Sequence, residues 1–143
     1  MFARSEGKSR ASQVATANVD KRRDRCRAVL SPHARRDLQE TLRWTLDKFG
    51  RDAVLRSEDL ILAALRDIEE DVARPGSLER GDLRPGIRSY HLRFSRNRTR
   101  SPLGIVKNPR HFIIYRPRQR CIDILRILHD GRDLQRHLPE ELD

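Results

Sequence analysis

The sequence has few of the residues that would place it in several common protein classes. Its only cysteines are Cys26 and Cys121, too few for a disulfide framework or a cysteine-rich zinc site. No stretch approaches the roughly 20 apolar residues of a membrane span. The N-terminus also lacks the apolar run of a secretory signal peptide. We therefore expect a cytoplasmic protein with reduced thiols and no membrane partner.

The sequence also lacks the short motifs of most catalytic and metal-binding sites. It contains no CxxC, HExxH or DxD spacing, no glycine-rich phosphate loop and no nucleophile elbow. His91 and His111 fall in predicted strands, without a cysteine or carboxylate in phase. These absences predict no metal ion and no cofactor.

Negative charge is missing from one long segment. Between Leu83 and Ile122 the sequence has no Asp or Glu, although arginines are frequent there, and the net charge of the whole chain is +10. Because the segment contains no carboxylate, we expect its cations to face water or an external anion rather than to form internal ion pairs. The sign of the charge favours nucleic acid, an acidic protein or an anionic membrane surface.

The length of 143 residues is that of one domain with a tail. Residues 1–24 are small, polar and basic without an apolar period, so we expect a disordered basic tail there. The predicted folded domain comprises residues 25–143.

The first half of this domain has the pattern of a strand followed by two helices. Residues 25–31 are a strand candidate, and Ser31-Pro32 is a typical helix start. Gly50 ends this helix, and a second is expected over 52–72. The apolar face predicted for the first helix consists of Leu38, Leu42, Leu46 and Phe49.

The second half has the pattern of strands. An irregular connector is expected over 75–86 and a long basic loop over 95–110. The predicted strands are 87–94, with Tyr90, Leu92 and Phe94 on one side, then 111–116 and 121–129; a short helix follows at 133–138.

The strand at 121–129 has apolar residues on both faces, which is typical of a central strand. Simple alternation places Ile122, Ile124 and Leu128 on one face, together with Arg126, and Leu125 and Ile127 on the other. The order β-α-α-β-β-β predicts an α+β fold, in which a helical hairpin packs on one face of a twisted, mostly antiparallel sheet.

Three segments resemble the RelE/ParE superfamily of toxins from type II toxin–antitoxin systems, and in particular its ParE branch. VLSPHARRDLQETLRWTLDKFG resembles the first strand and helix of that superfamily, and GDLRPGIRSYHLRF resembles the entry to its second strand. HFIIYR and CIDILRILHDGRDLQRHLP resemble the ending of the ParE branch. The resemblance covers residues 25–139 and implies that 25–143 is a toxin domain.

The resemblance to the ParE branch implies a protein without chemistry of its own. Such a toxin inhibits DNA gyrase, alone or in complex with DNA, by binding. It is neutralised by a cognate antitoxin, ParD-like or another small acidic protein, in a hetero-oligomer. A further possible function is that of an inactive family member that only binds an antitoxin.

The RelE branch, which cleaves mRNA on the ribosome, is the alternative function that the resemblance leaves open. The sequence has no tyrosine near its C-terminus, which disfavours this alternative. A nuclease would draw its catalytic groups from Lys107, Arg110, Arg116 and His129.

We expect an acidic and apolar partner to cover the sheet and its arginines together. For Arg126, an internal ion pair is the alternative to a partner contact. For His129, the alternative is a structural hydrogen bond to Asp130 or the backbone. The residues predicted to contact the antitoxin or the target are Trp44, Arg88, Arg110, Arg116, Arg126, His129 and Arg136.

Overall fold

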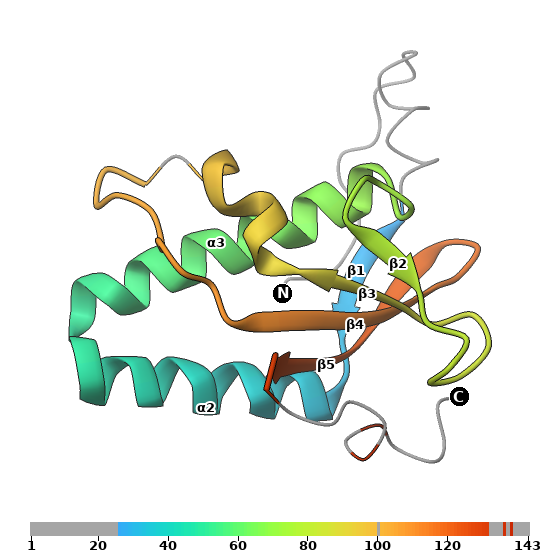
Figure 1. Cartoon of the computed structure of the whole chain (residues 1–143), viewed down its shortest axis with the longest axis horizontal. Coiled ribbons are helices and arrows are strands. Elements are labelled where there is room, and N and C mark those ends of the chain that lie inside the picture. Colours follow the sequence, from blue (N-terminus) through green and yellow to red (C-terminus); the bar gives the residue numbers. More distant parts are fainter. Residues whose placement is uncertain (1–25, 100, 132–135, 137, 139–143) are drawn as a thin grey trace, which may run out of the picture.

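The computed structural model of the protein describes residues 26–99, 101–131, 136 and 138. These residues form a five-stranded sheet in the order β1-β5-β4-β3-β2, with a helical hairpin on one face (Figure 1). The β1–β5 pairing is parallel and the other pairings are antiparallel. The predicted α+β fold is therefore confirmed, with one strand more than expected. The tail expected over 1–24 lies outside the described residues, as does most of the helix expected over 133–138.

Local sequence signals determine where the two helices begin and end. After β1 (Arg27–Leu30), the Ser31 hydroxyl accepts the Ala34 N–H at 3.0 Å and caps α2 (Pro32–Phe49). Gly50 separates α2 from α3 (Arg51–Glu70) with a φ of 91°, which glycine adopts without strain. The predicted helix start and the predicted break are both confirmed.

The helical hairpin projects beyond the sheet, and its far end has no strand beneath it (Figure 1). For this reason Leu46 and Phe49 are exposed, with 67 % of Phe49 accessible. The prediction that they belong to the buried face of α2 was wrong. Leu38, nearer the sheet, does pack against the core. Neither helix is long and apolar enough to cross a membrane, and this holds for every helix among the described residues.

The segment between α3 and the central strands differs from the prediction at two points. Strand β2 (Ser77–Glu79) lies inside the expected irregular connector and pairs with β3 (Arg88–His91). Strand β3 ends at His91, whose ring Nδ1 accepts the Arg93 N–H at 3.1 Å, and the chain continues as the 3₁₀ helix η1 (Leu92–Arg98). Phe94 is consequently half-exposed rather than aligned with Tyr90 in a strand.

A β-bulge changes which side chains of the central strand face the helices. In the pairing of β4 (His111–Pro117) with β5 (Cys121–His129), the register shifts between Ile114 and Tyr115, and Leu125 has no partner opposite it. Ile127 therefore faces the helices, whereas Leu128 faces the other side. The predicted grouping was wrong because it assumed uninterrupted alternation.

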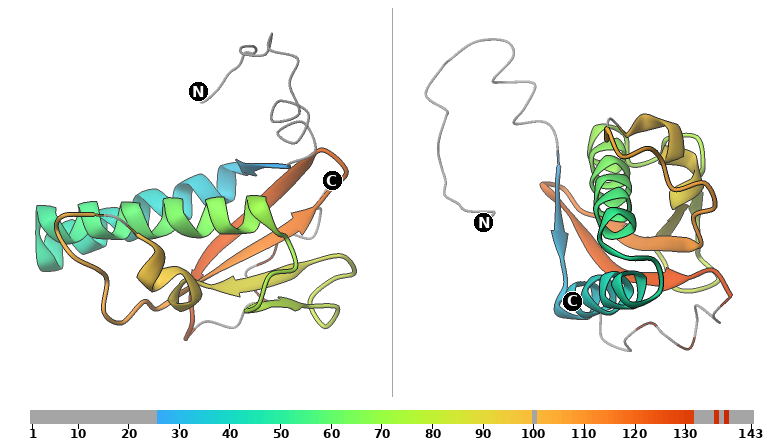
Figure 2. Two further views of the ribbon diagram at one scale, coloured as in Figure 1. Left: turned by 90° about the horizontal axis from the view of Figure 1, so that it is seen from above. Right: turned by 90° about the vertical axis from the view of Figure 1, so that its left-hand side faces the viewer.

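The sheet has a core on each face. The larger core lies between the sheet and the helices α2 and α3, which run side by side in both views of Figure 2. On the other face, Leu83 and Ile87 from the segment between β2 and β3, together with Leu138, pack against the strands. The apolar face expected to receive a partner is thus covered largely by the chain itself.

Candidate functional site

The structure distributes the predicted contact residues over separate parts of the molecule. Arg88 and Arg116 lie at one end of the sheet, and Arg110 and His129 lie at the other. A β-strand rises about 3.3 Å per residue, so Arg110, just before β4, and Arg116, near the end of β4, are roughly 20 Å apart. Trp44 lies on the projecting hairpin and Arg136 is exposed. These residues do not form one surface, and the four predicted nuclease residues do not form one site.

At the first end of the sheet, carboxylates from flanking elements neutralise the arginines. Glu79 of β2 lies opposite Arg88, and Asp123 of β5 lies opposite Arg116. We call this set the neutralised end. Its ion pairs are Arg80–Asp82 at 2.9 Å, Arg88–Glu79 at 3.6 Å, Arg116–Asp123 at 3.4 Å and Arg118–Asp123 at 2.5 Å. The expectation that arginines of the acid-free segment form no internal ion pairs was wrong here, because strand pairing supplies carboxylates from outside that segment.

Arg126 is held inside the fold. Its Nε and terminal nitrogen donate to the two carboxylate oxygens of Asp37 at 2.7 and 2.9 Å, and only 15 % of its side chain is exposed. The backbone N–H of Ile127 donates to the same carboxylate at 3.0 Å. This is the internal ion pair that the sequence left open as the alternative to a partner contact.

At the opposite end, Asp130 organises a cluster of charged and imidazole side chains. Its carboxylate accepts from the Arg110 guanidinium at 3.0 and 3.1 Å and from Nε2 of His91 at 3.0 Å. Hydrogen bonding to Arg110 lowers the pKa of Asp130 to about 2, against the opposing effect of partial burial, and His91 contributes in the same direction. Asp130 is therefore ionised over the whole physiological pH range.

Hydrogen bonding determines which nitrogen carries the proton in two of these imidazoles. His91 accepts the Arg93 N–H at Nδ1, so its proton is on Nε2 and is donated to Asp130. His129 accepts the Gly131 N–H at Nδ1, at 3.0 Å, so the proton of its neutral ring is also on Nε2. A general base must present an unprotonated nitrogen to its substrate. In this arrangement the exposed nitrogen of His129 is a donor, which disfavours a role as a base.

Two members of this cluster were not identified from the sequence. The sequence around His91 has no carboxylate in phase with it, and its partner Asp130 lies 39 residues away in the chain. His111 pairs with His129 across β4 and β5, and their rings meet edge to face at 5.4 Å. Only the strand register brings these residues together, and no local motif signals it.

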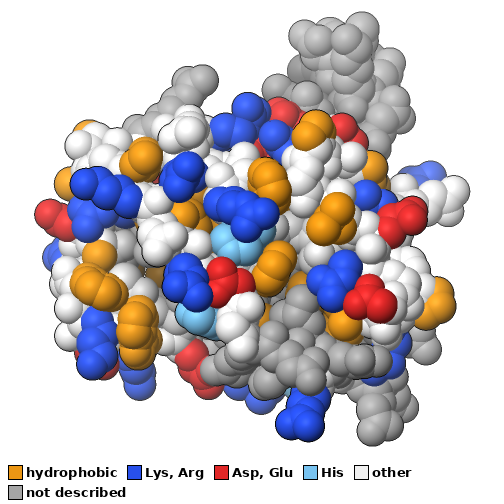
Figure 3. All heavy atoms as spheres, viewed as in Figure 1, with side chains coloured by type: hydrophobic (Ala, Val, Ile, Leu, Met, Phe, Trp, Pro, Cys, Tyr) orange, Lys and Arg blue, Asp and Glu red, His pale blue; other side chains and the backbone are white. Residues whose placement is uncertain are grey.

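Near this cluster lie cations that have no carboxylate partner among the described residues. Arg93, Arg96 and Lys107 make no ion pair within the described part of the chain. Arg96 donates to the backbone oxygen of Lys107 at 2.9 Å, so η1 and the loop before β4 are adjacent. We call Arg93, Arg96, Lys107 and Arg110 the cationic end. Figure 3 shows blue side chains gathered around pale blue and red ones on this face.

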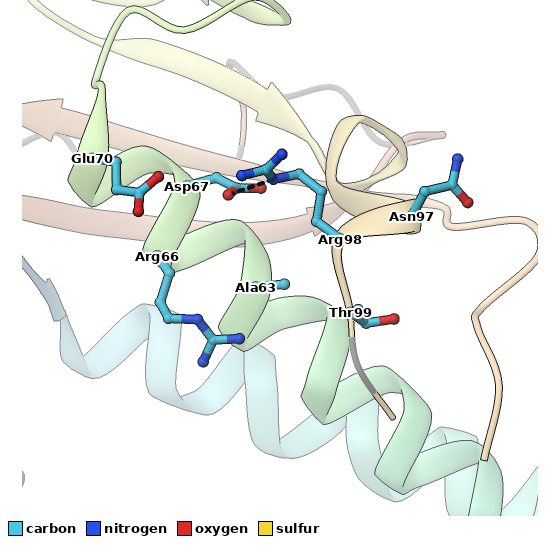
Figure 4. Close-up of a pocket in the computed structure, with 7 residues that line it drawn as sticks. All are labelled: Ala63, Arg66, Asp67, Glu70, Asn97, Arg98 and Thr99. Carbon is cyan, nitrogen blue, oxygen red and sulfur yellow. Dashed lines mark hydrogen bonds and ion pairs between the residues drawn. The ribbon is translucent and has the colours of Figure 1, made fainter. Parts of the chain in front are cut away.

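A hollow between α3 and η1 lies next to the cationic end. Its volume is about 560 Å³, and its residues are drawn in Figure 4, where Asp67 and Arg98 point toward each other. Buried Asp67 accepts from Arg98 at 2.7 Å and from Ser95 at 2.6 Å. These bonds fix η1 against α3 and so position Arg93 and Arg96. No group of metal-ligating side chains occurs among the described residues, here or elsewhere.

The fold, a five-stranded sheet with a helical hairpin on one face, defines a class of small α+β proteins that resemble RelE/ParE toxins. The sequence model of the family described as "ParE toxin of type II toxin-antitoxin system, parDE" matches residues 28–134. The chain therefore belongs to the ParE toxin family.

A solved structure titled "Chromosomal ParDE TA system from P. aeruginosa" has a similar fold. Its TM-score is 0.54 and its sequence identity 15 %, and the match covers 74 % of this chain and 97 % of that one. Among curated proteins, no relative matches. The resemblance inferred from the sequence is thus confirmed at the level of family and fold.

Proposed function

We propose that this chain is the toxin of a type II toxin–antitoxin pair, which acts in the cytoplasm by binding DNA gyrase and arresting it. The observation that carries the proposal is the family match over residues 28–134. ParE toxins inhibit gyrase by binding, as the sequence resemblance implied. A protein with this role needs a specific surface but no catalytic groups.

The arrangement of polar side chains supports inhibition by binding over mRNA cleavage. Of the four predicted nuclease residues, Arg116 is separated from Arg110 by the length of β4 and pairs with Asp123. Lys107, Arg110 and His129 do lie at the same end of the sheet. However, Nδ1 of His129 accepts the Gly131 N–H, so the neutral ring carries its proton on Nε2, and this tautomer disfavours His129 as the base beside these cations.

The antitoxin that we propose is a small acidic protein whose apolar side chains bind the projecting hairpin. Trp44 is 55 % exposed and its ring contacts that of Phe49 edge to face at 5.7 Å. Exposed aromatic residues of this kind often carry much of the binding energy of an interface. Arg110 and Arg136 are both exposed, and we propose them as further contacts for its carboxylates in the hetero-oligomer.

The test of gyrase inhibition uses the purified full chain with purified gyrase. We expect a dose-dependent loss of supercoiling and accumulation of cleaved plasmid, and both effects should disappear when the antitoxin is added. In an expressing bacterial host, the SOS response and filamentation should appear while mRNA remains intact. Rapid mRNA cleavage would replace the proposal with the nuclease alternative. Normal growth and unaffected supercoiling would indicate an inactive family member.

The antitoxin contact is tested separately with Trp44→Ala. We expect weakening of the antitoxin complex by about 30-fold, corresponding to about 2 kcal/mol for a buried aromatic anchor. Leu78→Ala is the matched control, because Leu78 is also an exposed apolar residue but lies at the β2 edge. Equal affinities of the two variants, measured by calorimetry, would place the antitoxin elsewhere.

A further inference from the structure

We infer that the cationic end is a binding site for the phosphate backbone of duplex DNA. Arg93 and Arg96 of η1 and Lys107 of the adjacent loop lie at the same end of the sheet as Arg110, whose carboxylate partner Asp130 is also bound to His91. The function goes beyond gyrase inhibition and does not depend on it, since the DNA would be bound by this chain itself.

The first argument is the charge that the fold leaves without a partner. Three cations of this end have no ion pair within the described residues, although arginines at the neutralised end do. Two elements hold these cations in place: η1, fixed to α3 through the Asp67–Arg98 bond of 2.7 Å, and the loop joined to η1 by the Arg96–Lys107 bond. A preorganised group of cations gains affinity for phosphates by releasing counterions from DNA.

The second argument concerns the kind of anion. Single-stranded nucleic acids are usually bound by exposed aromatic rings on which bases stack. Here the one exposed ring near these cations among the described phenylalanines, tyrosines and tryptophan is Phe94, which is 41 % exposed; the Arg93 guanidinium already lies over it at 4.7 Å, and the ring packs closely against Gly76. An acidic peptide would need a broad apolar surface beside the cations. Among the described residues, the exposed large apolar side chains in η1 and the loop before β4 are Phe94, Leu103 and Ile105, each only 37–41 % exposed, whereas the more exposed Trp44 lies on the projecting hairpin. Duplex DNA requires only the cations, and it presents one phosphate charge per about 1.7 Å of helix axis.

The site has no features that would read base sequence. It is formed by a short 3₁₀ helix, a loop and strand ends, and the long helices α2 and α3 do not contribute its cations. Sequence-specific proteins usually insert a helix or a strand pair into the major groove. We therefore expect DNA binding that is independent of sequence and strongly dependent on salt.

The experiment measures binding of the full chain to a fluorescein-labelled 20-base-pair duplex by anisotropy, at several salt concentrations. If three cations contact phosphates, affinity should fall by about 40-fold between 50 and 200 mM NaCl. Arg93→Gln combined with Lys107→Gln should lower the affinity at 100 mM NaCl by about 10-fold or more and reduce the slope against log salt by about two. Both side chains are exposed, so the variant should unfold at the same urea concentration as the wild type.

The matched control is Arg120→Gln, which removes an exposed arginine from the turn beside the neutralised end. Arg120 also makes no ion pair among the described residues, so Arg120→Gln is compared with Arg93→Gln alone, which makes the same change in net charge at the other position. Retained duplex binding in Arg120→Gln supports the inference. Equal losses in both variants would overturn it, as would tighter binding to single-stranded RNA or to polyglutamate than to the duplex. Because gyrase is absent from the assay, its outcome is independent of the proposed gyrase inhibition.

Discussion

Arg88, Arg116 and Arg118 at one end of the sheet each have a carboxylate within 3.6 Å, whereas Arg93, Arg96 and Lys107 near the other end have none among the described residues. All six come from the same acid-free segment of the sequence. The composition of that segment therefore does not determine which cations remain available. That depends on which residues the fold places next to each cation.

Sheet register explains the difference. At the neutralised end, β2 brings Glu79 opposite Arg88 and β5 brings Asp123 opposite Arg116. At the cationic end, the adjoining elements are η1 and the loop before β4, which belong to the acid-free segment themselves. Among the described residues, Asp130, directly after β5, is the carboxylate that reaches this end. Glu79 and Asp123, one carboxylate on each of two strands, thus neutralise one end of the sheet. The other end keeps cations that can bind an external anion.

The most complete internal pairing, between Asp37 and Arg126, should show the largest effect when it is broken. Asp37→Ala is expected to lower the free energy of unfolding by about 3–5 kcal/mol, because a mostly buried guanidinium loses its carboxylate. The Ile127 N–H also loses its acceptor. Urea denaturation monitored by circular dichroism measures the change.

The control for this variant is Glu40→Ala, in the exposed part of the same helix, for which we expect less than about 0.5 kcal/mol. Replacing the pair by Asp37→Leu with Arg126→Met should recover part of the loss. Recovery should remain incomplete because the Ile127 N–H still lacks a partner. A loss below about 1 kcal/mol in Asp37→Ala would mean that this ion pair does not stabilise the fold.

The parts of the fold that sequence predicts well are those with local causes. Ser31-Pro32 and Gly50 act through their own backbone geometry, and both helix boundaries follow from them. Strand β2 was not predicted because its three residues are too few to show an alternating pattern. The prediction for β3 extended to residue 94, whereas the strand ends at His91, whose side chain accepts the Arg93 N–H. The bulge at Leu125 depends on pairing with β4 and has no local signature.

The candidate site was less predictable for the same reason. Arg110 and His129 were identified from the sequence, but their connection through Asp130 to His91 spans 39 residues. The partner of Arg126 is 89 residues away. Whether an arginine is paired is a property of the register and of the helix packing, and neither can be read from charge spacing along one segment.

Asp130→Asn tests the carboxylate that binds Arg110 at the cationic end, with an intermediate expected effect. The pKa of Asp130 is lowered to about 2, below the roughly 3.9 of an unfolded chain. Its contribution to stability is therefore present above about pH 4 and is lost as the pH falls toward 2. Because Arg110 is half-exposed, we expect a loss of about 1–2 kcal/mol at pH 7, reduced by solvent screening.

This variant is compared with the wild type by urea denaturation at pH 7, 4 and 2.5. The two proteins should differ most at pH 7 and least at pH 2.5, since the wild-type carboxylate is then partly protonated. A difference that is constant with pH would contradict the assigned role of the Asp130 charge.

Asp123→Asn should have the smallest effect on stability, and it tests most directly why the two ends of the sheet differ in charge. Its ion pairs with Arg116 and Arg118 are partly exposed, so we expect a loss of less than about 1 kcal/mol. The variant removes the Asp123 charge from beside both guanidiniums and so makes the neutralised end more positive. Duplex DNA affinity should then rise several-fold and the salt dependence should steepen by about one phosphate contact.

Glu40→Gln makes the same change in net charge on α2, away from both ends, and should leave affinity within about 2-fold. If the two variants bind duplex equally well, net charge alone governs association, and the carboxylates of the neutralised end do not restrict where DNA binds.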